Sequence, residues 1–115
     1  MITRMRTGSR ISQIVVHDNT VYLAGQVASN LSTDTAGQTR EILAAVDNLL
    51  AEAGTNKSHV LAATVYLAHM SSFAAMNALW EAWVSPGCAP ARTTVEARLA
   101  GPGYQVEITI IAARS

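Results

Sequence analysis

The sequence predicts one soluble α/β domain with the element order ββαβαββ. Two stretches in which apolar residues recur at helical spacing are flanked by stretches that are rich in β-branched residues or alternate apolar and polar residues. The chain of 115 residues is long enough for one hydrophobic core, and no repeat or linker divides it. We therefore expect residues 1–115 to form a single domain.

A β-hairpin and a long helix are expected in the first half of the chain. Two apolar runs between residues 11 and 25 flank Asp18 and Asn19, which tolerate the positive φ of a tight turn. From Thr35 onward apolar residues fall on one helical face, and Gly54 is placed to end the helix. Gln38 and the charged residues of this stretch are expected on the remaining, polar side of the helix.

The second half is expected to contain a strand, a helix and a closing hairpin. Residues 60–68 are apolar and β-branched, so the helix before them makes a crossover between two strands. A second helix, capped by Ser71 or Ser72, carries an apolar stripe that includes Trp80. Residues 92–99 and 104–111 both alternate, and the turn 101–103 between them predicts that these two strands pair.

Composition and charge restrict the partners of the chain. Charged residues make up 14%, well below the roughly 25% of an average soluble domain, which favours burial of surface by self-association. Eight basic residues balance eight acidic ones, so we expect no nucleic acid and no anionic membrane as partner. The sequence shows no secretory signal and no apolar run of membrane-spanning length, and the single Cys88 cannot form an internal disulfide. These features predict a cytoplasmic protein.

Arg92 and Glu107 are the ionisable residues that best suit a site for a small acid. A guanidinium after a nearly apolar loop can grip the carboxylate of a 2-oxo or 2-imino acid through two parallel hydrogen bonds, although an ion pair with Glu96 is an alternative. If the two final strands pair, Glu96 and Glu107 lie nearly opposite each other. Such a pair either holds a water for general-base catalysis or belongs to an ordinary row of charges on a sheet.

Two further residues are candidates for contact with a ligand. Gly25, at the end of a strand, either allows a ligand close to the backbone or only turns the chain. Asn77 on the second helix either bonds a loop or ligand or faces solvent. The histidines are far apart and share no ligand spacing with each other or with Cys88, so no metal site is expected.

Several short segments occur together in an order and spacing that resemble those of the Rid family, also called the YjgF type. These segments are residues 21–27 (VYLAGQV), 38–40 (QTR), 49–54 (LLAEAG), 64–67 (TVYL), 73–77 (FAAMN), 90–96 (PARTTVE) and 106–108 (VEI). The resemblance extends over nearly the whole chain, and its specificity comes from the combination of the segments. It implies a chorismate-mutase-like fold, with one mixed sheet and two helices packed on one face, assembled as a homotrimer with ligand pockets between the subunits.

The resemblance also implies an activity and the roles of certain residues. Members hydrolyse reactive 2-imino or 2-enamino acids to 2-oxo acids and ammonia, without a cofactor. It implies that Arg92 grips the substrate carboxylate, that Glu107 holds the attacking water, and that the backbone at Gly25 lines the pocket with Thr94, close to Asn77.

The sequence departs from the commonest family pattern at two positions. Many members carry a tyrosine near the position of Ile11 and a cysteine at that of Thr94, so both changes reshape the pocket and affect substrate choice. A non-catalytic sensor of small carboxylates remains an alternative to the enzyme. RNA cleavage or chaperoning, also attributed to this family, is disfavoured by the zero net charge.

Overall fold

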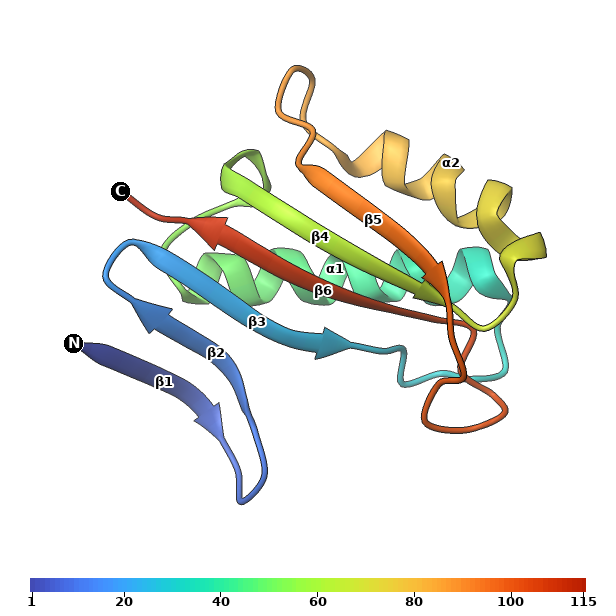
Figure 1. Cartoon of the computed structure of the whole chain (residues 1–115), viewed down its shortest axis with the longest axis horizontal. Helices are drawn as coiled ribbons and strands as arrows, with labels where there is room; N and C mark the ends of the chain where they lie inside the picture. Colours follow the sequence, from blue (N-terminus) through green and yellow to red (C-terminus); the bar gives the residue numbers. More distant parts are fainter.

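A computed structural model describes all residues 1–115 and consists of one six-stranded mixed sheet with two helices on one face (Figure 1). The strands are β1 (Ile2–Thr7), β2 (Ser12–His17), β3 (Thr20–Gln26), β4 (Val60–Leu67), β5 (Ala91–Glu96) and β6 (Val106–Ala113). The helices are α1 (Thr35–Glu52) and α2 (Phe73–Trp83), preceded by the short 3-10 turns η1 (Lys57–His59) and η2 (Met70–Ser72) in front of β4 and α2 respectively. The sheet order is β1-β2-β3-β6-β4-β5, so the α+β fold class expected from the sequence is confirmed.

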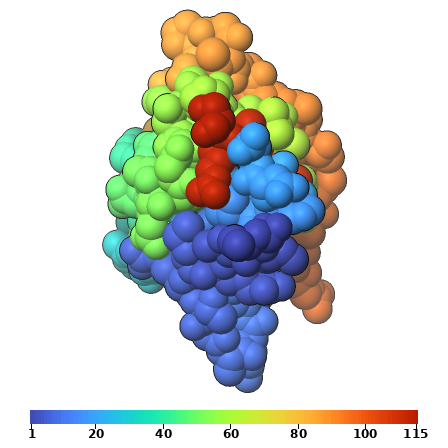
Figure 2. Space-filling view, turned by 90° about the vertical axis from the view of Figure 1, so that its left-hand side faces the viewer, coloured from blue at the N-terminus to red at the C-terminus, as the bar shows by residue number.

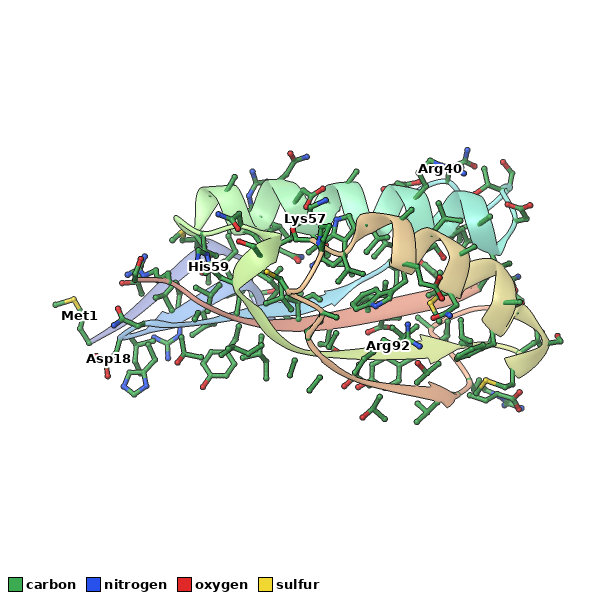
Figure 3. All side chains as sticks on the ribbon, turned by 90° about the horizontal axis from the view of Figure 1, so that it is seen from above. Met1, Asp18, Arg40, Lys57, His59 and Arg92 are labelled. Carbon is green, nitrogen blue, oxygen red and sulfur yellow. The ribbon has the colours of Figure 1, made fainter.

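The first hairpin and the crossover connections agree with the sequence prediction. Strands β2 and β3 pair antiparallel, and Asp18 in their turn has a φ of 54°. Both β3 and β4 run antiparallel to β6 between them, so α1 joins two parallel strands. Helix α2 then joins β4 to its parallel neighbour β5. Both helices therefore lie on the same face of the sheet, which Figure 3 shows from above.

The N-terminal strand β1 was not expected from the sequence, and the observed order is βββαβαββ. It pairs antiparallel with β2 at the edge of the sheet. Only Met5 packs against the core, so the strand lacks the apolar alternation that identifies a half-buried strand. Arg6 adopts a positive φ of 53°, and its guanidinium binds the carboxylate of Glu52 on α1 at 2.7 Å. Figure 2 shows this hairpin (blue) projecting beyond the rest of the molecule.

The predicted closing hairpin is wrong, because β4 lies between β5 and β6. Glu96 is level with Leu67 of β4, whereas Glu107 is level with Tyr66. Since adjacent residues of a strand point to opposite faces, the two carboxylates do not face each other. Alternation identified both strands correctly, but it carries no information about which strand is the neighbour.

The core fills the space between the sheet and the helices, and two polar residues of α1, Gln38 and Thr39, are fully buried beside it. Gln38 was expected on the polar side of α1, but it lies one turn before Ile42 on the buried face. Its Nε2 donates to the carbonyls of Thr33 and Gly103, and its Oε1 accepts from the backbone of Gln105. All of its hydrogen-bonding groups serve to hold the loop before β6 against the start of α1.

The face of the sheet opposite the helices is uncovered. The molecule measures 41 × 38 × 20 Å, and the short dimension reflects this two-layer arrangement. Three apolar side chains on the open face remain about 40% exposed, namely Tyr22, Val95 and Ile111. Neither helix is long and apolar enough to cross a membrane.

Candidate active site

Arg92 and Asn77 meet on the helix-covered face of the sheet. Arg92 stands near the start of edge strand β5, and its Nη1 donates a hydrogen bond of 2.7 Å to Oδ1 of Asn77 on α2. The amide of Asn77 in turn donates to Glu81, one helical turn further on. The Arg92 guanidinium also lies 5.4 Å from the ring centre of Trp80 and 5.7 Å from that of Phe73. These contacts orient a cation that keeps several N–H donors for an anion.

The alternative ion pair between Arg92 and Glu96 does not form. Both side chains are on the helix-covered face, but Glu96 accepts the backbone N–H of Met70 at 2.7 Å. It thereby fixes the turn η2 that starts α2. The rings of Phe73 and Trp80 on α2 both lie close to Arg92, although the sequence indicated only an apolar stripe on this helix. The signal for this role was their spacing on the helix. Phe73 lies one turn before Asn77 and Trp80 one turn after it, so the three side chains share one side of α2.

Glu107 and Gly25 meet on the open face, on neighbouring strands β6 and β3. The register of this pair shifts between Leu23 and Gln26, which places an irregularity in the segment that contains Gly25. A Cβ built on Gly25 would overlap Oε2 of Glu107 and lie 3.0 Å from its Cδ. The absence of a side chain at Gly25 is therefore what allows the Glu107 carboxylate to lie against β3.

Arg92 and Glu107 of one chain do not face each other. Arg92 is level with Ala63 of β4, which is buried in the core, whereas Glu107 is level with Tyr66 on the open face. Their strands are separated by β4, so the backbones are two strand spacings, or about 10 Å, apart. The structure thus divides the predicted residues into two groups on opposite faces.

Thr94 and Ile11 belong to different parts of the molecule. Thr94 follows Arg92 on the same face of β5, and its buried hydroxyl has no hydrogen-bond partner within the chain. Ile11 lies in the β1–β2 connection at the far side of the sheet and is 54% exposed. Near it, the side chain of Gln26 donates to that of Gln13, so Ile11 is at the Gly25 end of β3.

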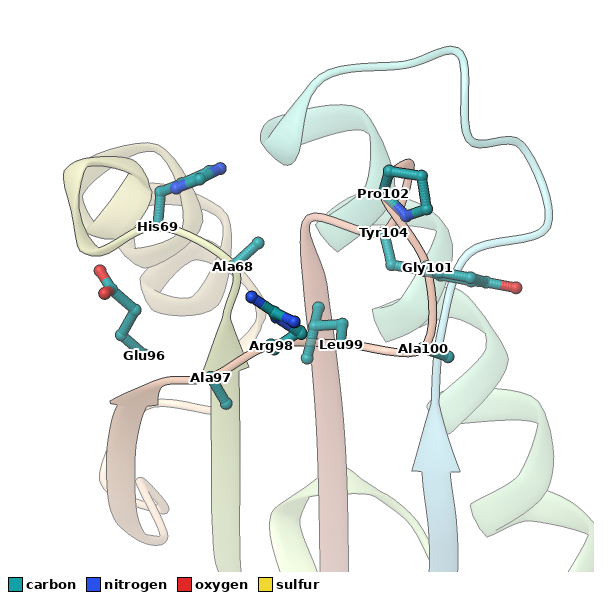
Figure 4. A pocket seen from close by; sticks show the side chains of 10 residues that line it. All are labelled: Ala68, His69, Glu96, Ala97, Arg98, Leu99, Ala100, Gly101, Pro102 and Tyr104. Atoms are coloured by element: carbon teal, nitrogen blue, oxygen red, sulfur yellow. The ribbon is translucent and has the colours of Figure 1, made fainter.

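Two hollows lie where β4 and β5 end. The larger, of about 800 Å³, lies between the end of β4 and the loop before β6 (Figure 4) and contains His69, Arg98 and Tyr104. The smaller, of about 320 Å³, is lined by Tyr66, Arg98 and Glu107. Arg98 is common to both. The alternation predicted a strand through residue 99, but β5 ends at Glu96, so Arg98 lies on the loop beyond the sheet.

Two carboxyl groups with lowered pKa values lie away from Arg92 and Glu107. Backbone hydrogen bonds from Ser29, and then from Asn30, lower the pKa of Glu41. The hydrogen bond from Arg6 lowers the pKa of Glu52. These carboxylates fasten the loop after β3 and the strand β1 to α1. They are structural contacts away from Arg92 and Glu107.

Comparison with known proteins gives matches along essentially the whole chain. The family model described as Endoribonuclease L-PSP matches residues 1–114. The RutC family protein YoaB of Escherichia coli is 48% identical over 97% of both chains. NMB1025 from Neisseria meningitidis, a member of the YjgF protein family, has a solved structure with a TM-score of 0.95 and 44% identity, covering 100% of this chain and 96% of that one. YyfA of Yersinia pestis, from the conserved Rid protein family, gives a TM-score of 0.85 at 28% identity, covering 93% and 90%.

Proposed function

Since this chain belongs to the Rid family, also called the YjgF type, we propose that it hydrolyses reactive 2-imino or 2-enamino acids to 2-oxo acids and ammonia. Arg92 binds the substrate carboxylate, and Glu107 positions the attacking water. The observation that carries the proposal is the oriented guanidinium of Arg92, which Asn77 holds at 2.7 Å while its other donors remain available.

The chemistry requires little beyond positioning. The carbon of a protonated imine is already electrophilic, so fixing the carboxylate and aiming one water supplies most of the rate enhancement. The water oxygen bonds to the imine carbon while Glu107 takes one of its protons, which gives a carbinolamine. Glu107 returns that proton to the nitrogen, the C–N bond breaks, and the hydroxyl proton leaves with ammonia as ammonium. The net reaction consumes one iminium and one water and releases one 2-oxo acid and one ammonium ion.

The opposite placement of Arg92 and Glu107 supports a site between two subunits. One substrate carbon cannot reach both groups within a chain, because β4 and the thickness of the sheet separate them. Arg92 of one subunit and Glu107 of the next meet when the open face of one chain packs against the β5 edge of another. The exposed apolar side chains of the open face favour such packing, and we propose a homotrimer with three equivalent sites.

The orphan hydroxyl of Thr94 supports the same location for the substrate. A buried hydroxyl without a partner is unfavourable, and a bound ligand or water next to Arg92 supplies one. Gly25 contributes through the backbone beside Glu107. Ile11 lies in the β1–β2 connection at the Gly25 end of β3 and is exposed, so its apolar side chain is available to border the pocket in the assembly.

Replacing Arg92 tests the proposal. A 2-imino acid, such as 2-iminopropanoate, is generated by an amino-acid oxidase and its loss is followed with a carbonyl trapping agent. The wild-type protein should accelerate hydrolysis. Arg92→Ala should lower kcat/KM by roughly 100-fold or more, because the carboxylate loses a bidentate charged partner. Arg40→Ala, an exposed arginine on α1, serves as the matched control and should retain full activity.

The same assay distinguishes an imine hydrolase from the two alternative functions, a carboxylate sensor and an RNA-cleaving enzyme. A carboxylate sensor would bind 2-oxo acids without accelerating the loss of imine. The family model is described as an endoribonuclease, but a net charge of zero gives no attraction toward a phosphate backbone. Salt-dependent retention of RNA in a filter-binding assay, without imine turnover, would favour that activity instead.

A further inference from the structure

Arg98 is a cation that lines both hollows described above, and the proposed reaction does not use it. It lies just beyond the end of β5, on the loop that leads over the end of β4 toward β6. It lines the hollow of about 800 Å³ and also the hollow of about 320 Å³ that contains Glu107. Figure 4 shows its side chain between Ala68 and Leu99, with Glu96 on the other side of the end of β4.

The chain itself provides no anion for Arg98. Its only cation–carboxylate pairs within 4 Å are Arg6 with Glu52 and His17 with Asp18. Of the two carboxylates that share a hollow with Arg98, Glu96 accepts the backbone N–H of Met70, and Glu107 lies against Gly25. Arg98 also makes no hydrogen bond, whereas Arg92 is held by Asn77.

The surroundings of Arg98 suit a carboxylate at the end of a short apolar chain. Ala97, Leu99 and Ala100 line both hollows together with Arg98. Arg98 is exposed, so an anion can reach its guanidinium from solvent, and the planar fork of N–H donors matches the two oxygens of a carboxylate. Tyr104 and His69 add polar groups at the wall of the larger hollow only.

We propose that Arg98 determines specificity for 2-imino acids that carry a second carboxylate at the end of the side chain, such as the imines of glutamate and aspartate. The inference rests on the proposed function. In a site between subunits, Arg92 comes from one chain, whereas Glu107 and Arg98 come from its neighbour and share one hollow. The α-carboxylate then binds Arg92, the reacting carbon lies over the water at Glu107, and the distal carboxylate binds Arg98.

Matched substrates test the inference. The values of kcat/KM are compared for 2-iminoglutarate and 2-iminopentanoate, whose side chains have similar length but differ in charge. The wild-type protein should prefer 2-iminoglutarate, and Arg98→Gln should lower that preference by roughly tenfold, since one charge-assisted contact is lost. Arg98→Lys, which keeps the charge, should retain part of the preference. Arg40→Gln, which removes an exposed arginine that lines neither hollow, should leave the ratio unchanged.

A binding measurement makes the test independent of turnover. The affinities of 2-oxoglutarate and 2-oxopentanoate are measured by titration calorimetry for the wild type and Arg98→Gln. Tighter binding of the dicarboxylate that depends on Arg98 supports the inference, and equal ratios in the two proteins overturn it. Acceleration of 2-iminopentanoate alone would also overturn it while leaving the proposed function intact. Failure to accelerate either imine would overturn the proposed function, and the oxo-acid affinities would still decide the role of Arg98.

Discussion

At Gly25, the absence of a side chain determines where a carboxylate lies on the neighbouring strand. The glycine does not have a positive φ, so its conformation alone does not require glycine. The requirement comes from Glu107, whose carboxylate occupies the space that a Cβ would take. Because the overlapping atom is the far end of a flexible side chain, an added methyl group displaces the carboxylate rather than the backbone.

Gly25→Ala is therefore expected to reduce activity while leaving the fold intact. Imine hydrolysis should fall by roughly tenfold or more, because a misplaced base no longer aims the water. The unfolding free energy should change by no more than about 1 kcal/mol, as judged by urea denaturation. Gly8→Ala is the control, since a Cβ there has no close neighbour. Unchanged turnover in Gly25→Ala would show that the observed position of Glu107 is not needed.

At the scale of elements, the sequence predicted where helices and strands occur better than it predicted which strands are neighbours in the sheet. The crossover through α1 followed from apolar periodicity and from Gly54, which has a φ of +85° at the helix end. The placement of β4 between β5 and β6 did not follow, since alternation is a property of each strand alone. Arg92, Asn77 and Glu107 were identified as candidates, but their division between two faces depends on that pairing.

Gln38 on α1 binds the segment before α1 and the loop before β6. Replacing it tests how much these contacts stabilise the loop that carries Arg98. Gln38→Leu should lower the unfolding free energy by roughly 2–5 kcal/mol, because it leaves the part-buried carbonyls of Thr33 and Gly103 and the amide of Gln105 without their partner. Asn48→Leu, an exposed polar-to-apolar change on the same helix, is the matched control. Equal denaturation midpoints for the two variants would contradict a structural role for the buried amide.

At the scale of the whole molecule, the proposed site depends on assembly. One chain presents Arg92 on its covered face and Glu107 on its open face, so the proposed site draws one group from each of two chains. The low charged fraction of 14% and the exposed apolar side chains of the open face agree with such an assembly.

Mixing two inactive variants tests the division of the site. Arg92→Ala and Glu107→Gln should each be inactive alone, yet mixed oligomers formed by co-expression should recover about a quarter of the sites, because each site draws one group from each of two chains. Ultracentrifugation of each variant should give the mass of a trimer, as a control for assembly. Mixed oligomers with no activity would place both groups in the site of a single chain.

The position of Arg92 and Glu107 on opposite faces also restricts the symmetry of the assembly. A contact that brings Arg92 of one copy to Glu107 of another joins two different surfaces of the protein. Such a contact is head-to-tail rather than two-fold. Head-to-tail contacts either close into a ring or continue into a filament. Closure into a ring makes the number of sites equal to the number of chains, and it leaves no end at which the same contact can add further copies.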